Sequence, residues 1–86
     1  KTLLVNPNPA VHGELRFIID PSAAGIWHCR LFDGLGRCVF DAGEIPCGYD
    51  GEPVKIGLPD GLMPGTYWLE GFDGKSRLTE RVMIAP

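Results

Sequence analysis

Residues 26–41, with the sequence IWHCRLFDGLGRCVFD, carry the clearest secondary-structure signal of this chain. Apolar and polar side chains alternate along Ile26–Phe32, which is the pattern of a β-strand with one buried face. The Asp33–Gly36 segment supplies turn residues, and alternation resumes over Arg37–Asp41. The stretch therefore predicts an antiparallel hairpin. The side chains expected to face the core are Trp27, Cys29, Leu31, Cys38 and Phe40.

Alternation continues on both sides of this hairpin, and the dipeptide Asp-Gly, a strong turn former, occurs four times. Turns this frequent leave no room for long helices. We expect seven strands, at Thr2–Val5, Gly13–Asp20, Ile26–Phe32, Arg37–Asp41, Pro53–Leu58, Thr66–Phe72 and Lys75–Ile84. Their other inward side chains should be Leu15, Phe17, Ile19, Val54, Ile56, Leu58, Tyr67, Leu69, Val82 and Ile84. The fold class is all-β, a seven-stranded immunoglobulin-like Greek-key β-sandwich, with Ala42–Glu52 as the irregular crossing between sheets.

Eighty-six residues suffice for one domain, and we interpret residues 1–86 as a single unit excised from a longer protein. The formal net charge of −3 comes without a basic stripe, which argues against nucleic-acid binding. No apolar run is long enough for a transmembrane segment. Because the chain starts at Lys1 without a hydrophobic leader, the cellular location of the parent protein must be inferred from other features.

The sequence favours no catalytic, cofactor or metal site. The serines fall in predicted turns, and the aspartates lie one per turn, which turn propensity explains better than a calcium loop does. The three cysteines lack zinc-site spacing. We expect Cys29 and Cys38 to be buried, reduced and slow to react, and Cys47 to be exposed in the long loop.

Several large apolar residues fall on the outward parity of the predicted strands. They are Ile18, Phe32, Val39, Trp68 and Met83. If they gather on one sheet they form an interface; if neighbouring loops or a preceding domain cover them, they have no such role.

Three ordered blocks resemble the C-terminal sorting domain (type A) of the type IX secretion system of Bacteroidetes. The first block is Asn6-Pro7-Asn8-Pro9-Ala10 followed by Gly13, the second is the Leu31–Val39 hairpin, and the third is Leu62–Tyr67 with its Pro-Gly turn. The motif residues are Pro7, Asn8, Pro9, Gly13, Asp33, Gly36, Arg37, Pro64, Gly65 and Tyr67. Each block alone is ordinary turn chemistry, and the match rests on their order across nearly the whole chain.

The resemblance implies a domain that directs export across the outer membrane and attachment to the cell surface. Its partners would be the outer-membrane shuttle and the sortase of the machinery, together with anionic lipopolysaccharide. Its location would be the periplasm in transit, then the cell surface or the medium. The segment expected to be recognised is the last strand, at Arg81, Val82, Met83 and Ile84.

One departure from the family leaves two alternatives open. Family members commonly end in lysine or arginine, whereas this chain ends at Pro86. The domain could instead be a retained part of a surface component of the same machinery. A second alternative is an immunoglobulin-like or fibronectin-like accessory module of a secreted enzyme or adhesin, with Trp68 and Phe72 stacking against carbohydrate.

Overall fold

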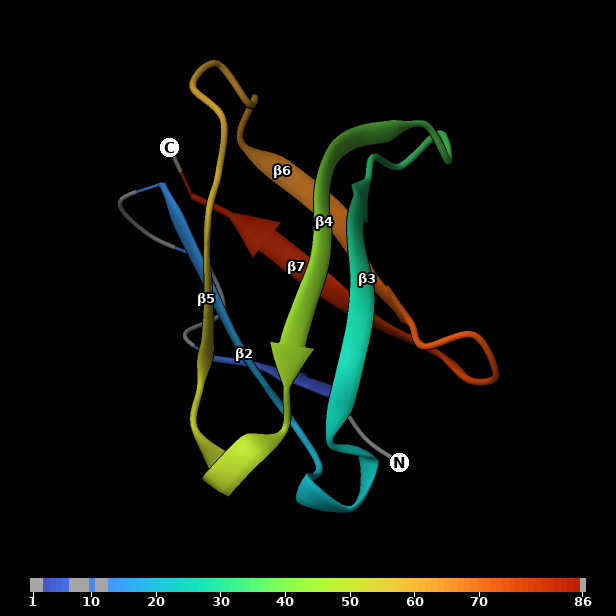
Figure 1. Cartoon of the computed structure of the whole chain (residues 1–86). Coiled ribbons are helices and arrows are strands. Elements are labelled where there is room, and N and C mark those ends of the chain that lie inside the picture. Colours follow the sequence, from blue (N-terminus) through green and yellow to red (C-terminus); the bar gives the residue numbers. More distant parts are fainter. Residues whose placement is uncertain (1–2, 7–9, 11–12, 86) are drawn as a thin grey trace.

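The computed structural model describes residues 3–6, 10 and 13–85, which form an all-β domain of two antiparallel sheets (Figure 1). The strands are β1 (Leu3–Val5), β2 (Glu14–Ile19), β3 (Gly25–Phe32), β4 (Cys38–Cys47), β5 (Val54–Gly57), β6 (Gly65–Phe72) and β7 (Arg77–Ile84). One sheet has the order β1-β2-β5 and the other the order β4-β3-β6-β7. Short 3₁₀ turns, η1 (Pro21–Ala23) and η2 (Tyr49–Gly51), precede β3 and β5. The predicted all-β class and two-sheet sandwich are confirmed.

The core lies between the two sheets and is built by the alternation that the sequence displays. The β2 side chains Leu15, Phe17 and Ile19 face three β3 side chains, Trp27, Cys29 and Leu31, and all six are buried. Trp27 is the largest of the fully buried residues, and its indole Nε1 donates a 2.9 Å hydrogen bond to the carbonyl of Ala23. The indole also packs closely over the backbone of Gly71 on β6. Trp27 therefore joins η1, β3 and β6 at the centre of the sandwich.

The fourth strand corrects one prediction. The segment expected to be the irregular crossing begins instead as strand, because β4 continues to Cys47 and pairs with the first half of β3. A bulge makes this possible: Gly43 has a φ of +78°, and the pairing shifts register between Cys29 and Arg30. Pro46 does not end the strand, because β4 lies at the sheet edge, where a missing N–H is tolerated. The other six strands match their predicted bounds within two residues.

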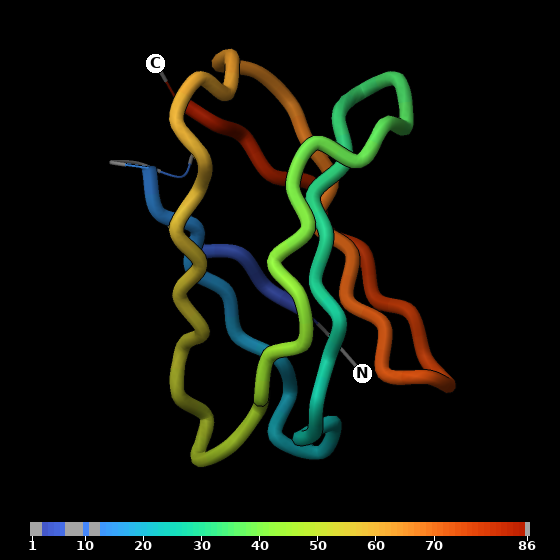
Figure 2. The backbone as a smooth tube through the Cα atoms, turned by 45° about the horizontal axis from the view of Figure 1, so that its top comes forward, coloured from blue at the N-terminus to red at the C-terminus, as the bar shows by residue number. Residues whose placement is uncertain are grey.

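The β3–β4 hairpin also corrects the predicted direction of Cys38. A second register shift places Cys38 opposite Phe32, on the outward parity, and Cys38 is exposed. Phe40 stays on the inward side and is partly buried against the core. Figure 2 shows the loop of this hairpin and the β6–β7 turn projecting at opposite ends of the four-stranded sheet. The outer face of that sheet lies between these two loops.

Candidate interaction surfaces

The C-terminal strand β7 lies at the edge of the four-stranded sheet, but part of that edge is already occupied. Ala10 forms a parallel bridge with Ile84: its N–H donates to the Met83 carbonyl at 2.7 Å, and its carbonyl accepts from the Ala85 N–H at 3.4 Å. Ala10 is itself buried. The end of the first motif block therefore meets the last strand of the chain. Pro7, Asn8 and Pro9 of that block lie outside the described residues.

The predicted recognition segment divides between the two sides of β7. Val82 is fully buried opposite Tyr67, and Ile84 is partly buried, as the alternation predicts. Arg81 and Met83 are exposed on the outer face of the sheet. A partner that binds here can thus contact Arg81 and Met83 but not Val82.

The second motif block is a hairpin loop that Asp33 and Arg37 close. The Asp33 carboxylate accepts hydrogen bonds from the backbone N–H groups of Leu35 and Arg37, and the Arg37 Nε donates to its second oxygen at 2.8 Å. The Arg37 backbone N–H, followed by its side chain, lowers the pKa of Asp33 against the opposing effect of desolvation. Gly36 has a φ of +83°, which glycine adopts without strain. These motif residues build the loop.

The third block fixes the entry into β6. The Tyr67 hydroxyl donates a 2.6 Å hydrogen bond to the carbonyl of Met63, while its ring is buried in the core. Pro64 and Gly65 lie between them, and Gly65 has a φ of +151° that favours glycine. Gly13, from the first block, accepts from the Leu58 N–H at 2.8 Å and so holds the start of β2 to the end of β5.

The outward apolar residues gather mainly on one face. Phe32, Trp68 and Met83 lie on the outer face of the β4-β3-β6-β7 sheet, where Phe32 is opposite Trp68. Trp68, Phe72 and Met83 are 42%, 37% and 38% exposed. Val39 lies on the edge strand β4 and is partly buried. Ile18 does not join this face, because it lies on β2 opposite the exposed Leu4.

Arginine side chains accompany these aromatic rings. Arg30 lies over the ring of Phe32 at 5.1 Å, and Arg77 lies over the ring of Phe72 at 5.0 Å. Arg81 pairs with Trp68 across β6 and β7. We call this surface the arginine platform; it consists of Arg30, Phe32, Trp68, Glu70, Phe72, Arg77 and Arg81.

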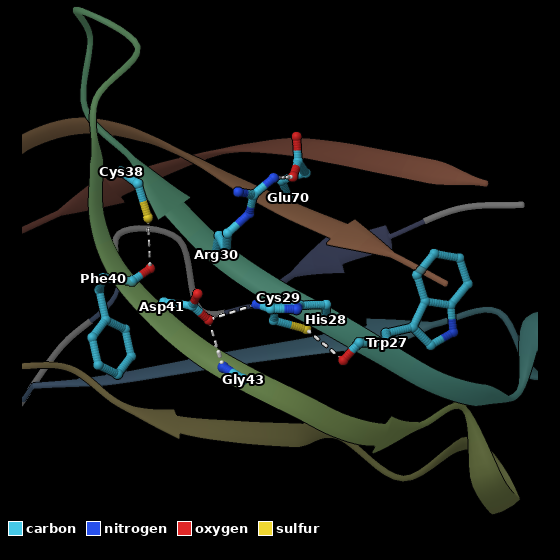
Figure 3. A network of polar contacts seen from close by, with 9 residues as sticks. All are labelled: Trp27, His28, Cys29, Arg30, Cys38, Phe40, Asp41, Gly43 and Glu70. Carbon is cyan, nitrogen blue, oxygen red and sulfur yellow. Dashed lines mark hydrogen bonds and ion pairs between the residues drawn. The ribbon is translucent and has the colours of Figure 1, made fainter. Parts of the chain in front are cut away.

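Glu70 organises the platform. Its carboxylate accepts from Arg30 Nη2 at 2.7 Å and forms an ion pair with Arg77 Nε at 3.4 Å (Figure 3 shows the Arg30 contact). The Glu70 side chain is only 14% exposed, whereas those of Arg30 and Arg77 are 37% and 57% exposed. Sequence reasoning missed this pairing, because it depends on β3 and β6 being neighbours, which no local pattern reveals.

A second polar cluster lies beside the platform, toward β4. Asp41 accepts from the Gly43 N–H at 2.8 Å and contacts His28 Nε2 at 2.7 Å (Figure 3). The hydrogen bond from Gly43, followed by the one with His28, lowers the pKa of Asp41. The contact with Gly43 caps the bulge, so this pair has a structural role in shaping β4.

The cysteines are distributed differently from the prediction. Cys29 and Cys47 are buried, Cys38 is exposed, and all three are free thiols. The Cys47 thiol, together with burial, raises the pKa of Cys29. A thiol whose pKa is raised holds very little thiolate, which is the nucleophilic form. Cys29 is therefore a core residue and an unreactive one.

Native alkylation should therefore modify Cys38 first. Reagent must reach the sulfur, so the buried Cys29 and Cys47 should react only on unfolding. Intact mass after brief iodoacetamide treatment should show one adduct, and peptide mapping should place it at Cys38. A Cys38→Ser control should remain unmodified under the same conditions. Rapid labelling at Cys47 would contradict its burial.

Among the described residues, no group of three or more His, Cys, Asp or Glu side chains could hold a metal ion. The described part of the chain also contains no helix long and apolar enough to cross a membrane. Comparisons of the chain with protein-family models, with curated proteins and with solved structures returned no match.

Proposed function

We propose that this chain is a non-catalytic C-terminal sorting domain of the type IX secretion system. Its folded surface would direct a passenger protein across the outer membrane and to the cell surface. The outer-membrane shuttle would be its first partner and the sortase its second. The proposal rests on the order of the three motif blocks, which the resemblance supplies.

The observation that supports it best is the contact between Ala10 and β7. The first motif block and the terminal strand come from opposite ends of the chain, yet Ala10 bonds to Met83 and Ala85. A folded signal needs such a contact, because it makes one surface from segments distant in sequence. The other motif residues, including Asp33, Arg37 and Tyr67, order the loops of the same sandwich.

Two further features support the immunoglobulin-like part of the proposal. Such sandwiches commonly bury a tryptophan on their third strand and place a tyrosine at the start of the sixth, with its hydroxyl bonded to the backbone just upstream. Trp27 on β3 and Tyr67 on β6 have these positions.

Export of a reporter tests the function. The segment is fused to the C-terminus of a periplasmic reporter in a Bacteroidetes host with an intact type IX system. We expect the reporter at the cell surface, accessible to added protease, and retained in the periplasm when the system is deleted. A folded, intact fusion that stays in the periplasm of the intact host would refute the proposal.

The accessory-module alternative keeps one specific observation in its favour, the arginine platform on the outer sheet face. A module that binds a ligand through this face would act without the sorting machinery. The reporter experiment separates the two functions, because an accessory module would leave its passenger in the periplasm.

A further inference from the structure

The arginine platform concentrates positive charge on an acidic protein. It holds three arginines and one carboxylate, Glu70. The whole chain has eight basic and eleven acidic residues, so the remainder has five basic and ten acidic residues, a formal charge of −5. On the same face, the exposed β4 residues Asp41 and Glu44 lie opposite Arg30 and His28, so the excess of arginine is confined to the half of the face over β6 and β7. That half is therefore the part of the face suited to attract an anion.

Two of the arginines are held in place before any ligand arrives. Glu70 binds both Arg30 and Arg77, and each guanidinium also rests on a phenylalanine ring. A guanidinium has five N–H donors, and the contacts with Glu70 use only part of them. Since both side chains are already ordered, binding an anion costs less conformational entropy than it would with mobile arginines.

Trp68 adds an apolar surface next to these charges. It lies between Phe32 on β3 and Arg81 on β7, and it is 42% exposed on the open face of the sheet. Side chains directly opposite in an antiparallel pair are about 5 Å apart at Cβ. The platform thus offers an aromatic ring and a cation at neighbouring positions. A pyranose ring that bears a carboxylate presents the complementary pair, a flat C–H face and an anion.

We propose that the arginine platform binds an acidic polysaccharide whose sugar rings carry carboxylates. One sugar ring packs on Trp68, and its neighbours place carboxylates against Arg77, Arg81 or Arg30. This inference names a ligand class for the carbohydrate-binding alternative and does not depend on the sorting function, so failure of the export experiment would leave it standing.

A polysaccharide fits this surface better than an acidic peptide does. Peptides commonly bind by adding a strand to a sheet edge or by laying a helix in a groove. The platform is the face of a sheet, where the backbone groups of β3 and β6 are already paired with neighbouring strands. An acidic peptide would meet the arginines here without gaining backbone hydrogen bonds.

Titration of the whole chain with oligogalacturonate tests the proposal. NMR shift changes should concentrate on the outward residues of β3, β6 and β7, and binding should weaken as salt is raised. Trp68→Ala should weaken binding ~10-fold, through loss of the stacking surface. Arg77→Gln should weaken it by about the same factor, through loss of a charged contact.

Arg16→Gln is the matched control. Arg16 is also an exposed arginine paired with a glutamate, Glu14, but it lies on β2 in the other sheet, and its loss should leave affinity unchanged. Methyl-esterified oligogalacturonate and polyglutamate serve as ligand controls, and both should bind at least ~10-fold more weakly.

Three results would overturn the proposal. These are no binding of oligogalacturonate, equal weakening by Arg16→Gln and Arg77→Gln, and polyglutamate binding as tight as that of the glycan. Circular dichroism of each variant confirms that it is folded. If Trp68→Ala failed to fold, Arg77→Gln would still decide the question.

Discussion

Replacement of Trp27 by alanine should remove a large share of the domain's free energy of unfolding and lower its urea midpoint steeply. Trp27 is fully buried, contacts Gly71 on β6 and bonds to Ala23 before β3, so its loss opens a cavity at the centre of the sandwich. Buried tryptophan-to-alanine changes cost about 3–5 kcal/mol in free energy of unfolding. A small domain has only about 5–15 kcal/mol in total.

The second tryptophan provides the matched control. Trp68 is 42% exposed on the outer sheet face, so Trp68→Ala should shift the urea midpoint only slightly. Far-ultraviolet circular dichroism measures both midpoints. Fluorescence adds an independent check, because the protein that retains only Trp27 should emit at shorter wavelength than wild type. Equal losses of stability in the two variants would show that Trp27 is not central to the core.

The parts of the fold predicted correctly are those that depend on local pattern. Leu15, Phe17 and Ile19 alternate with polar residues, and a strand with such a pattern has only one way to bury its apolar side. The loop at Asp33–Gly36 is equally local. The Asp33 carboxylate accepts a hydrogen bond from the nearby Leu35 N–H, and Gly36 adopts the positive φ that the turn requires. These choices need no knowledge of the rest of the chain.

The parts predicted wrongly depend on register, which a bulge can change. Asp41 and Gly43 look like the end of a strand, but Asp41 caps the Gly43 N–H and the strand continues through a bulge. Each register shift reverses the parity of the neighbouring strand residues, so Cys38 points outward and Cys47 lies in the core. The only sequence feature that indicates this bulge is Asp41-Ala42-Gly43, and the same residues are equally typical of a turn that ends a strand.

The candidate surfaces were the least predictable, because they join strands distant in sequence. Trp68 and Met83 could be assigned to an outward face from parity alone. The pairing of Glu70 with Arg30 and Arg77, and that of Ala10 with Met83, requires the strand order. Hydrophobic alternation predicts which side of a strand is buried, but it does not predict which strands are paired.

The sorting proposal predicts that a change confined to the exposed side of β7 abolishes export. Deleting the end of β7 would not test this cleanly, because Val82 is fully buried and its removal would damage the core. The double variant Arg81→Ser/Met83→Ser alters two outward side chains and keeps the strand. A partner at this edge can contact only the outward side chains. Surface display of the reporter should therefore fall at least ~10-fold, which corresponds to a loss of about 1.4 kcal/mol or more in the free energy of binding to the partner.

Arg77→Ser is the matched control for this experiment. Arg77 is an outward arginine at the other end of β7, far along the strand from Ala10, and its replacement should leave display near the wild-type level. Purified fusions of both variants should keep the wild-type circular dichroism spectrum and urea midpoint. Under those conditions, full display of the double variant would place recognition elsewhere on the sandwich. The same Arg77 change should weaken oligogalacturonate binding. Arg81 belongs to both proposed surfaces, so the double variant should weaken glycan binding as well as export. Arg77→Ser should weaken glycan binding alone, which would separate the two activities at Arg77.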